Sequence, residues 1–411
     1  MPLFYFKSPM QTFFSRCLLL LTVFVSTCAY AHPYPVGYQD QIWVNKALCP
    51  DPSAPDESKA CRRIMVRMYY PAQAQQVSPV SAYPQWVIAR FLQPIKGHAS
   101  DKQYQEIAKR LAAIKLPARK ALPVSKHTFP VILFSPGAID NAEEYSKLLI
   151  NLASHGYVVV AINDTYLTTV QFPDEQLVPA NSTFQQVAHL PALYRLKYLD
   201  IAFALKHVLA MHCQSQRAGR SVACAMNKHK IGALGHSGGA SAVIAMAHQH
   251  PKLIQAAVAL DAPNQTDPKT NLNLAKAKVH FASMFNVFSG FDVPMLQMHS
   301  SYARFFLGTP QAEFHLLPHN YLVTISRGHH GYFKHMDYSD YALFRDMSVL
   351  LPWQQLLFPS VLYGTVSGHR AALVVNTYIV AFFNRFLKRH VNQAWSRCMP
   401  LTQDTQIQCG H

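Results

Sequence analysis

One short stretch, residues 230–243, restricts the fold of this chain more than any other. Apolar residues lead into a Gly-x-Ser-x-Gly pattern centred on Ser237, and a run of small residues follows. This order predicts a strand, a sharp turn and a helix, and such a turn lifts a serine hydroxyl above the edge of a sheet. Gly235 and Gly239 let the backbone turn without a Cβ clash. The alternative role for Ser237 is to cap the following helix.

Short apolar strands alternate with helices along the rest of the chain. Such alternation indicates an α/β fold with a mostly parallel sheet and helices on both faces. The predicted strands are 63–70, 130–135, 157–162, 256–260, 294–298 and 321–325, and the predicted helices include 141–154, 191–209, 240–248 and 374–387. Residues 80–124 carry mixed helical signals, such as 104–114, ahead of a core strand. We interpret 80–124 as an insertion in the N-terminal half and a candidate cap over the site.

The N-terminus has the features of a secretory signal peptide. Lys7 and Arg16 precede an apolar run at 17–28, and Ala29-Tyr-Ala31 fits an A-x-A cleavage site. The apolar run is too short to span a membrane. We therefore expect residues 1–31 to be removed, residues 32–411 to form one domain, and the protein to be exported, either periplasmic or secreted.

Cysteine usage agrees with export. Six cysteines remain after residue 31, and they form three local pairs separated by twelve, eleven and eleven positions: Cys49 and Cys61, Cys213 and Cys224, Cys398 and Cys409. In an oxidising compartment this pattern suggests three short-loop disulfides, although six cysteines allow 15 connectivities. Buried free thiols are the alternative. No C-x-x-C motif occurs, so a zinc or redox site has no support.

The chain is strongly basic, with a formal net charge of +16. Loss of Lys7 and Arg16 with the signal peptide removes two charges and leaves +14. This charge favours contact with an anionic membrane surface. Nucleic acid is the other partner that a basic chain suggests. Because the basic residues are scattered and no nucleic-acid motif appears, we expect no nucleic-acid partner.

A serine nucleophile needs a base to take its proton and an acid to orient that base. When the nucleophile lies on such a strand–turn–helix, both partners follow it in the chain, acid before base. Asp261 ends the strand at 256–260, which places its carboxylate at the same sheet edge as Ser237. The next strand is followed by His299-Ser300-Ser301 and offers no carboxylate, and Asp292 precedes that strand. Asp261 is therefore the predicted acid, although it could instead cap its loop.

The base should follow the strand at 321–325. The segment 326–340 contains His329, His330 and His335, and spacing alone does not choose among them. They could also be metal ligands, but no second cluster would complete such a site, and we expect neither a metal nor another cofactor.

Tetrahedral intermediates need an oxyanion hole. We expect one donor to be the amide of Gly238, directly after the nucleophile. The other should come from Gly137 or Ala138, in the loop that follows Ser135.

Several segments together resemble the platelet-activating factor acetylhydrolase family of α/β-hydrolases, including its bacterial members. The matching pieces are Met-Tyr-Tyr-Pro-Ala at 68–72, Pro-Val-Ile-Leu-Phe-Ser-Pro-Gly at 130–137, Leu-Ala-Ser-His-Gly-Tyr-Val-Val-Val at 152–160, the turn at 235–239, Leu-Asp at 260–261, His-Met-Asp-Tyr-Ser-Asp at 335–340 and the terminal helix at 381–387. The resemblance implies the α/β-hydrolase fold. It implies Asp261 as the acid and His335 as the base, with His330 as the alternative because residues 330–333 also fit H-x-x-F.

Two residues depart from the family pattern. Pro136 replaces a histidine before Gly137, which bears on the geometry of the oxyanion loop. Gly238 replaces a bulkier residue after the nucleophile, which suggests a roomier or differently shaped site beside Ser237.

The leading functional hypothesis is a secreted serine hydrolase of carboxylic esters, with short-chain acyl esters or (lyso)phospholipids as plausible substrates. Acyl transfer to another lipid or sterol would use the same triad. A polyester or dienelactone hydrolase would share the chemistry and differ in pocket shape. A non-catalytic exported binding protein of the same fold is the alternative outside enzymes.

Overall fold

The computed structural model describes residues 34–55, 59–73, 83–186, 189–216, 219–262, 293–300, 319–326, 368–390 and 393–410. The chain divides into two compact units, Met1–Pro33 and Tyr34–His411. Every described residue belongs to the second unit, so the expected signal peptide lies outside the described part of the chain.

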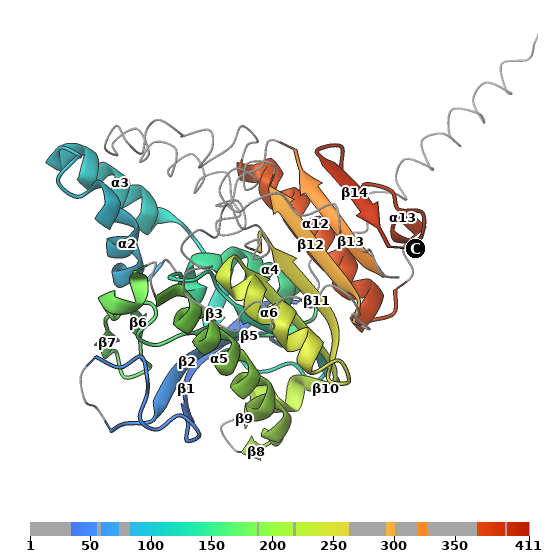
Figure 1. Ribbon diagram of the computed structural model, residues 1–411, viewed down its shortest axis with the longest axis horizontal. Helices are drawn as coiled ribbons and strands as arrows, with labels where there is room; N and C mark the ends of the chain where they lie inside the picture. The colour runs from blue at the N-terminus through green and yellow to red at the C-terminus, as the bar shows by residue number, and fades with distance from the viewer. Residues whose placement is uncertain are drawn as a thin grey trace, which may run out of the picture. The chain divides into compact units, whose positions relative to one another are not determined.

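A large sheet dominates the described residues (Figure 1), in which ten strands follow the order β14-β13-β12-β11-β10-β4-β5-β2-β1-β3. The six neighbours from β13 to β5 are parallel, whereas β14, β2 and β1 pair antiparallel at the two sides. The strands are β1 (Val36–Asn45), β2 (Arg62–Pro71), β3 (Ala118–Lys120), β4 (Phe129–Ser135), β5 (Val158–Asn163), β10 (Met226–His236), β11 (Ile254–Leu260), β12 (Met295–Ser300), β13 (Asn320–Ile325) and β14 (Thr405–Cys409). Two small hairpins pair β6 (Val170–Gln171) with β7 (Leu177–Val178) and β8 (Ser215–Gln216) with β9 (Gly219–Arg220).

Helices cover both faces of this sheet. The α-helices are α2 (Gln85–Leu92), α3 (Asp101–Ala113), α4 (Ser146–Ser154), α5 (Leu190–Ala210), α6 (Gly238–Gln249), α12 (Gly368–Leu387) and α13 (Gln393–Ser396), and the short 3₁₀ helices are η1 (Gln93–Ile95), η2 (Ala142–Tyr145), η3 (Ser182–Gln185) and η5 (Val222–Ala225). Helices α5 and α6 pack on one face, and α4 and α12 pack on the other.

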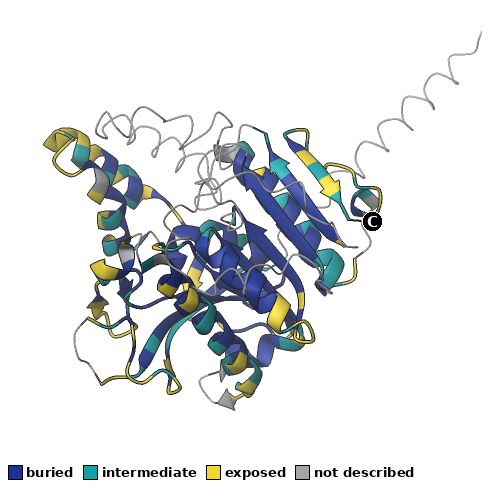
Figure 2. Ribbon diagram, viewed as in Figure 1, coloured by how far each residue is buried: buried dark blue, intermediate teal, exposed yellow. Residues whose placement is uncertain are grey.

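The central strands are buried on both faces (Figure 2). In β4, Ile132 and Phe134 join the apolar cluster under α4 and α12, whereas Val131 and Leu133 join the cluster under α5 and α6. Side chains of a strand alternate between its two faces, so a strand covered twice must be apolar at every position. This explains the unbroken apolar run at 130–134.

The structure confirms the predicted parallel sheet, and differs from the prediction at its edges. The predicted strand at 321–325 is found as β13, but β14 follows it at the edge of the sheet, and β1 and β3 join the other side. These edge strands lack the buried apolar run of a central strand: β14 reads Thr-Gln-Ile-Gln-Cys and β3 has three residues. Within 80–124, the predicted helix at 104–114 is found as α3, and α2 and β3 accompany it.

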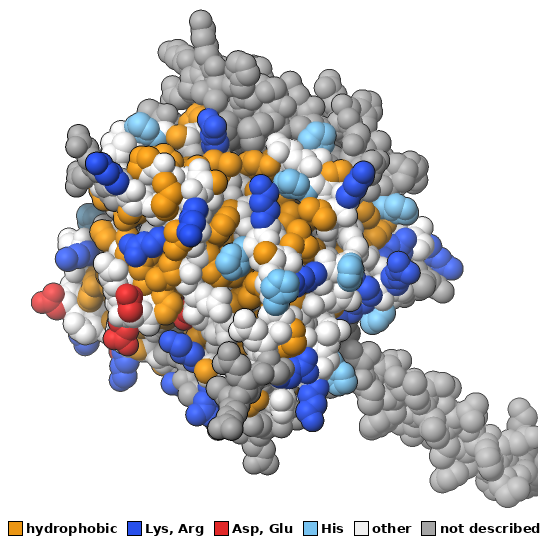
Figure 3. Space-filling view, turned by 90° about the horizontal axis from the view of Figure 1, so that it is seen from below, with side chains coloured by type: hydrophobic (Ala, Val, Ile, Leu, Met, Phe, Trp, Pro, Cys, Tyr) orange, Lys and Arg blue, Asp and Glu red, His pale blue; other side chains and the backbone are white. Residues whose placement is uncertain are grey.

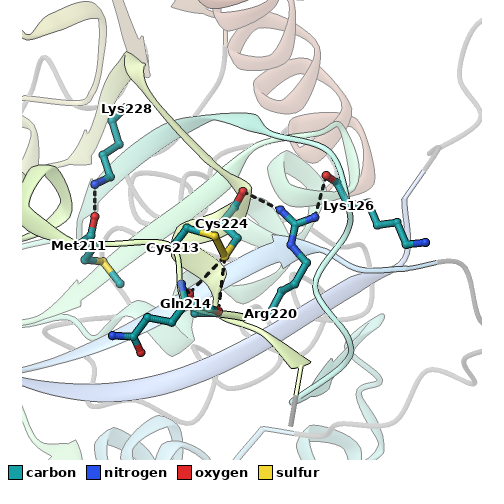
Figure 4. Close-up of a disulfide and its surroundings, with 8 residues drawn as sticks. Lys126, Met211, Cys213, Gln214, Arg220, Cys224 and Lys228 are labelled. Carbon is teal, nitrogen blue, oxygen red and sulfur yellow. Dashed lines mark hydrogen bonds between the residues drawn. A yellow bond between two sulfur atoms is a disulfide. The ribbon is translucent and has the colours of Figure 1, made fainter. Parts of the chain in front are cut away.

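All three predicted disulfides are present, linking Cys49 to Cys61, Cys213 to Cys224 and Cys398 to Cys409. The second joins the end of α5 to the approach to β10 (Figure 4). Around it, the Arg220 guanidinium donates to the carbonyl oxygens of Cys224 and Lys126. Three disulfides indicate an exported protein, because they persist in oxidising compartments. No helix among the described residues is long and apolar enough to cross a membrane.

A buried cluster of charges lies where β2, β5 and α5 meet. Arg62 pairs with Asp200, at 2.6 Å from Nε to Oδ1, and with Asp51, at 3.2 Å. Lys197 pairs with Asp164 in the same cluster. Burial raises the pKa of Asp200, Arg62 opposes this rise and the nearby charge of Asp164 adds to it, so that the pKa is about 7.

Asp200 should make stability depend on pH. In the unfolded chain an aspartate loses its proton near pH 4, whereas folded Asp200 keeps it until about pH 7. The native state therefore binds more protons over this range, and the free energy of unfolding falls as pH rises from about 4 to about 7. Urea unfolding at a series of pH values should show a shallower fall for Asp200→Asn.

Asp174→Asn is the matched control, because it removes the same charge from an exposed position. It should keep the pH dependence of the wild type. Equal slopes for Asp200→Asn and the wild type would contradict the assignment of this pH dependence to Asp200.

Candidate active site

Ser237 occupies the sharp turn between β10 and α6. Its backbone has φ +51° and ψ −121°, a conformation that costs a non-glycine residue energy and is concentrated at functional sites. The Ser237 amide donates to the carbonyl oxygen of Leu260 at 2.8 Å, which ties the turn to the neighbouring strand β11. The Ser237 hydroxyl makes no capping hydrogen bond to α6, and this argues against the helix-cap alternative.

The glycines of the turn are required by close backbone contacts. A Cβ atom on Gly235 would lie 2.3 Å from the carbonyl oxygen of Gly239. A Cβ atom on Gly239 would lie 2.1 Å from the carbonyl oxygen of Ser135 and 2.3 Å from that of Pro136. The turn therefore packs backbone to backbone against the end of β4, where the loop predicted to supply the second oxyanion donor begins.

Asp261 lies beside Ser237 across the sheet. Strands β10 and β11 are parallel and His236 is in register with Leu260, so the two residues that follow are neighbours at the same edge. Asp261 is fully buried and, like Ser237, has a positive φ of +43°. Its amide donates to the carbonyl oxygen of Met298, so the bent end of β11 is fixed to β12.

The Asp261 carboxylate is held by residues that follow it along the sheet edge. Ser300 donates both its amide, at 2.8 Å, and its hydroxyl, at 2.7 Å, to the two carboxylate oxygens. His299 places Nδ1 at 3.6 Å from Oδ1 of Asp261, and its Nε2 lies 3.3 Å from the side-chain oxygen of Gln297. The sequence at 299–301 indicated only that no carboxylate follows this strand, and gave no sign that His299 and Ser300 are partners of Asp261.

The candidate bases lie elsewhere in the chain. His329, His330 and His335 fall in 327–367, outside the described residues. Their placement against Ser237 and Asp261 therefore stays a prediction. Among the described residues, no group of three His, Cys, Asp or Glu side chains is arranged to hold a metal ion.

The two expected oxyanion donors lie against each other. A Cβ atom on Gly238 would lie 3.2 Å from Cα and from Cβ of Ala138, so the loop after β4 touches the turn directly after Ser237. The Gly137 amide donates to the hydroxyl of Tyr145 at 3.1 Å, and Gly137 is buried, whereas Ala138 is half-buried. Of the two candidates that the sequence left open, the structure favours Ala138, because the amide of Gly137 is already used.

The absence of a side chain at Gly238 had suggested a roomier or differently shaped site, and the structure shows what lies in the space beside it. A Cβ atom on Gly238 would meet Cε1 of Tyr194 at 2.7 Å. Tyr194 extends from α5 and packs with Leu167, Phe184 and Leu193 in a small apolar cluster that also contacts Ala138. Burial raises the pKa of the Tyr194 hydroxyl to about 12, which keeps the ring neutral. An aromatic ring from α5 thus occupies the space that a side chain at position 238 would need.

Comparisons with known proteins agree with the fold and the predicted class of enzyme. The model of the family described as platelet-activating factor acetylhydrolase, isoform II, matches residues 23–178. Among solved structures, a ferulic acid esterase from Streptomyces cinnamoneus is similar, with a TM-score of 0.66, 21% identity, and coverage of 92% of this chain and 98% of that one. A search of curated proteins finds no match. The predicted α/β-hydrolase fold is thereby confirmed, and both matches are named for ester-hydrolysing enzymes, in agreement with the predicted class of enzyme.

The contact between Gly238 and Tyr194 can be tested by adding one methyl group. In Gly238→Ala, the new Cβ must displace either the Tyr194 ring or the Ala138 loop. Because one oxyanion donor is worth about 10²–10³ in kcat, we expect kcat for p-nitrophenyl acetate to fall at least about tenfold.

The double variant Gly238→Ala/Tyr194→Leu makes room for the methyl group and should recover a large part of the loss. Tyr194→Leu alone serves as its control. Full activity in Gly238→Ala, or a double variant no better than the single one, would contradict the contact.

Proposed function

We propose that this chain, a carboxylic ester hydrolase that resembles the platelet-activating factor acetylhydrolase family over residues 23–178, cleaves its substrate with a triad of Ser237, His335 and Asp261. The observation that carries the proposal is the pairing of the β10 and β11 ends. It sets a strained, half-buried serine beside a buried, hydrogen-bonded aspartate. These are the first two members of a triad in the chain order that this fold uses.

In this mechanism the Ser237 hydroxyl attacks the acyl carbonyl carbon while His335 takes its proton. The negative charge that develops on the carbonyl oxygen is accepted by the amides of Gly238 and Ala138. His335 then donates its proton to the departing alcohol, which leaves an acyl group on Ser237. Water, deprotonated by His335, attacks this acyl group and releases the acid.

Asp261 orients His335 and stabilises its charged form. Its own position is fixed by Ser300, which donates two hydrogen bonds to the carboxylate. Ser300 therefore supports the triad from the far side of Asp261.

We infer a substrate with a short acyl chain, such as a short-chain acyl ester or a (lyso)phospholipid. The Tyr194 ring lies against both Gly238 and Ala138, so it narrows the space next to the proposed oxyanion position. For the same reason we disfavour esters with a bulky acyl group. A phospholipid substrate would also suit a basic protein that contacts an anionic membrane.

The surface charge supports contact with an anionic membrane. Lys, Arg and His side chains are spread across the face seen in Figure 3, with apolar side chains between them and few acidic ones. A basic surface of this kind is attracted to anionic lipid headgroups, and the attraction weakens with salt. We propose a periplasmic or secreted protein that loses residues 1–31 as a signal peptide and uses residues 32–411 as its α/β-hydrolase domain.

Within that domain, residues 80–124 are proposed as an insertion that borders the site. Helix α2 of this insertion reaches the oxyanion loop directly. Arg90 pairs with Glu144 at 3.0 Å and donates to the carbonyl oxygen of Ile139. The insertion and the loop therefore share a boundary beside Ala138.

Replacement of Ser237 by alanine should abolish ester hydrolysis. We expect the rate with p-nitrophenyl acetate to fall at least 10⁴-fold, because no nucleophile remains, while the unfolding midpoint is kept. A fluorophosphonate probe should label the wild type at Ser237 and leave Ser237→Ala unlabelled. Equal hydrolysis by the wild type and Ser237→Ala would sink the proposal.

A panel of acyl esters, lysophospholipids and phospholipids should show highest kcat/KM for the shortest acyl chains, and an acceptor-dependent product would indicate acyl transfer instead.

Two variants of the same segment distinguish His335 from His330 as the catalytic base. His335→Ala should lose activity to nearly the level of Ser237→Ala, because members of a triad act as a unit. His330→Ala should retain it within about tenfold. The reverse result would move the base to His330, and full activity in both would leave neither histidine as the base.

A further inference from the structure

Three groups converge on the hydroxyl of Tyr145, which ends η2 beneath the oxyanion loop. The Gly137 amide donates to it at 3.1 Å, Asp140 Oδ2 lies at 2.8 Å, and His236 Nδ1 lies at 2.6 Å. The side chains of Tyr145, Asp140 and His236 are all more than nine-tenths buried. This cluster has no part in the proposed triad.

The three contacts fit the bonding capacity of one hydroxyl. A tyrosine hydroxyl has one proton to donate and can accept two hydrogen bonds. Donation to the Asp140 carboxylate leaves it to accept from the Gly137 amide and from Nδ1–H of His236. This arrangement satisfies every group and places a proton on Nδ1 of His236. Burial, together with the charges of Asp140 and Glu144, raises the pKa of Tyr145 well above its usual range, so the hydroxyl stays protonated.

The hydroxyl joins two parts of the site that the chain keeps far apart. Gly137 belongs to the oxyanion loop, and His236 is the residue directly before Ser237. The packing at this junction is tight, since a Cβ atom on Gly137 would lie 2.1 Å from Asp140 Oδ2 and 3.3 Å from the Tyr145 hydroxyl. Tyr145 therefore sets the position of the loop relative to the nucleophile.

Ala138 is fixed on both sides of its position. Before it, the Gly137 amide is held by Tyr145. After it, the Ile139 carbonyl accepts from Arg90, and the Ala142 amide donates to the Asn163 side chain at 2.6 Å. No acceptor for the Ala138 amide occurs among the described residues. The groups on either side of Ala138 are thus held by hydrogen bonds.

We propose that Tyr145 is a positioning residue: its hydroxyl holds the Gly137 amide and the His236 imidazole together, and so aims the Ala138 amide at the oxyanion beside Ser237. This inference rests on the proposed function of Ser237. Tyr145 makes no contact with substrate in this proposal and acts through Ala138 alone. Its effect belongs to the transition state, where charge develops on the carbonyl oxygen.

Tyr145→Phe tests this role, because it removes the hydroxyl and keeps the ring. With p-nitrophenyl acetate, kcat should fall about 10- to 100-fold while KM changes less than about threefold, the pattern of an interaction made only in the transition state. Affinity for a trifluoromethyl ketone, which forms a tetrahedral adduct with the serine, should fall by a similar factor.

Tyr157→Phe is the matched control. Tyr157 is also fully buried, and its hydroxyl donates one hydrogen bond, to Asn384 at 2.7 Å, next to the amino end of β5 and so at the opposite edge of the sheet. Its loss should lower the unfolding midpoint by a comparable amount and leave kcat within about twofold. Equal kcat in the two variants, or a rise in KM alone for Tyr145→Phe, would overturn the proposal.

His236→Leu gives an independent test and decides the matter if Tyr145→Phe does not fold. It removes the imidazole that hydrogen-bonds to the Tyr145 hydroxyl, so kcat should fall with little change in KM. In the double variant Tyr145→Phe/His236→Leu, kcat should fall by no more than about the larger of the two single losses. Fully additive losses, or an unchanged kcat in His236→Leu, would count against the proposal. Failure of the proposed function is a separate result, since it requires an active Ser237→Ala protein.

Discussion

The site depends on the parallel register between β10 and β11. Because His236 pairs with Leu260, the next residue of each strand, Ser237 and Asp261, leaves the sheet at the same point. Both residues adopt a positive φ there, and the amides of both are tied to the next strand, to Leu260 and Met298. The strain of two bent strand ends is thus offset by regular sheet hydrogen bonds. The surrounding sheet makes a geometry tolerable that an isolated turn would avoid.

A second layer of constraint comes from backbone packing. Gly239 brings the turn so close to the end of β4 that no side chain fits between them, and Gly235 allows the same close contact within the turn. The oxyanion loop then lies on this contact, held by Tyr145 from beneath and by Arg90 from the insertion. The proposed donors therefore have little freedom to move before the reaction. Such preorganised donors stabilise developing charge without reorganisation at the moment of reaction.

The sequence predicted those parts that local pattern controls. Unbroken apolar runs located β4, β5 and β11, and the glycine spacing located the turn at Ser237. The short spacing of the cysteines predicted all three disulfides. Edge strands such as β14 were missed because one exposed face removes the apolar run. Tyr145, Tyr194 and Ser300 were missed for another reason: each contacts the strand end or turn around Ser237 and Asp261 from a distant part of the chain, and only the tertiary fold brings it there.

The ring of Tyr194 has a consequence for how homologues of this chain can change. Positions 194 and 238 share one volume, which is filled here from α5, whereas members of the family that the chain resembles are expected to have a larger residue at 238. A chain with a large residue at 238 then needs a small residue at the position of Tyr194. The two positions should therefore vary together among homologues, with their summed side-chain volume nearly constant. A substitution at position 194 or 238 alone would leave either a clash or a void beside the nucleophile.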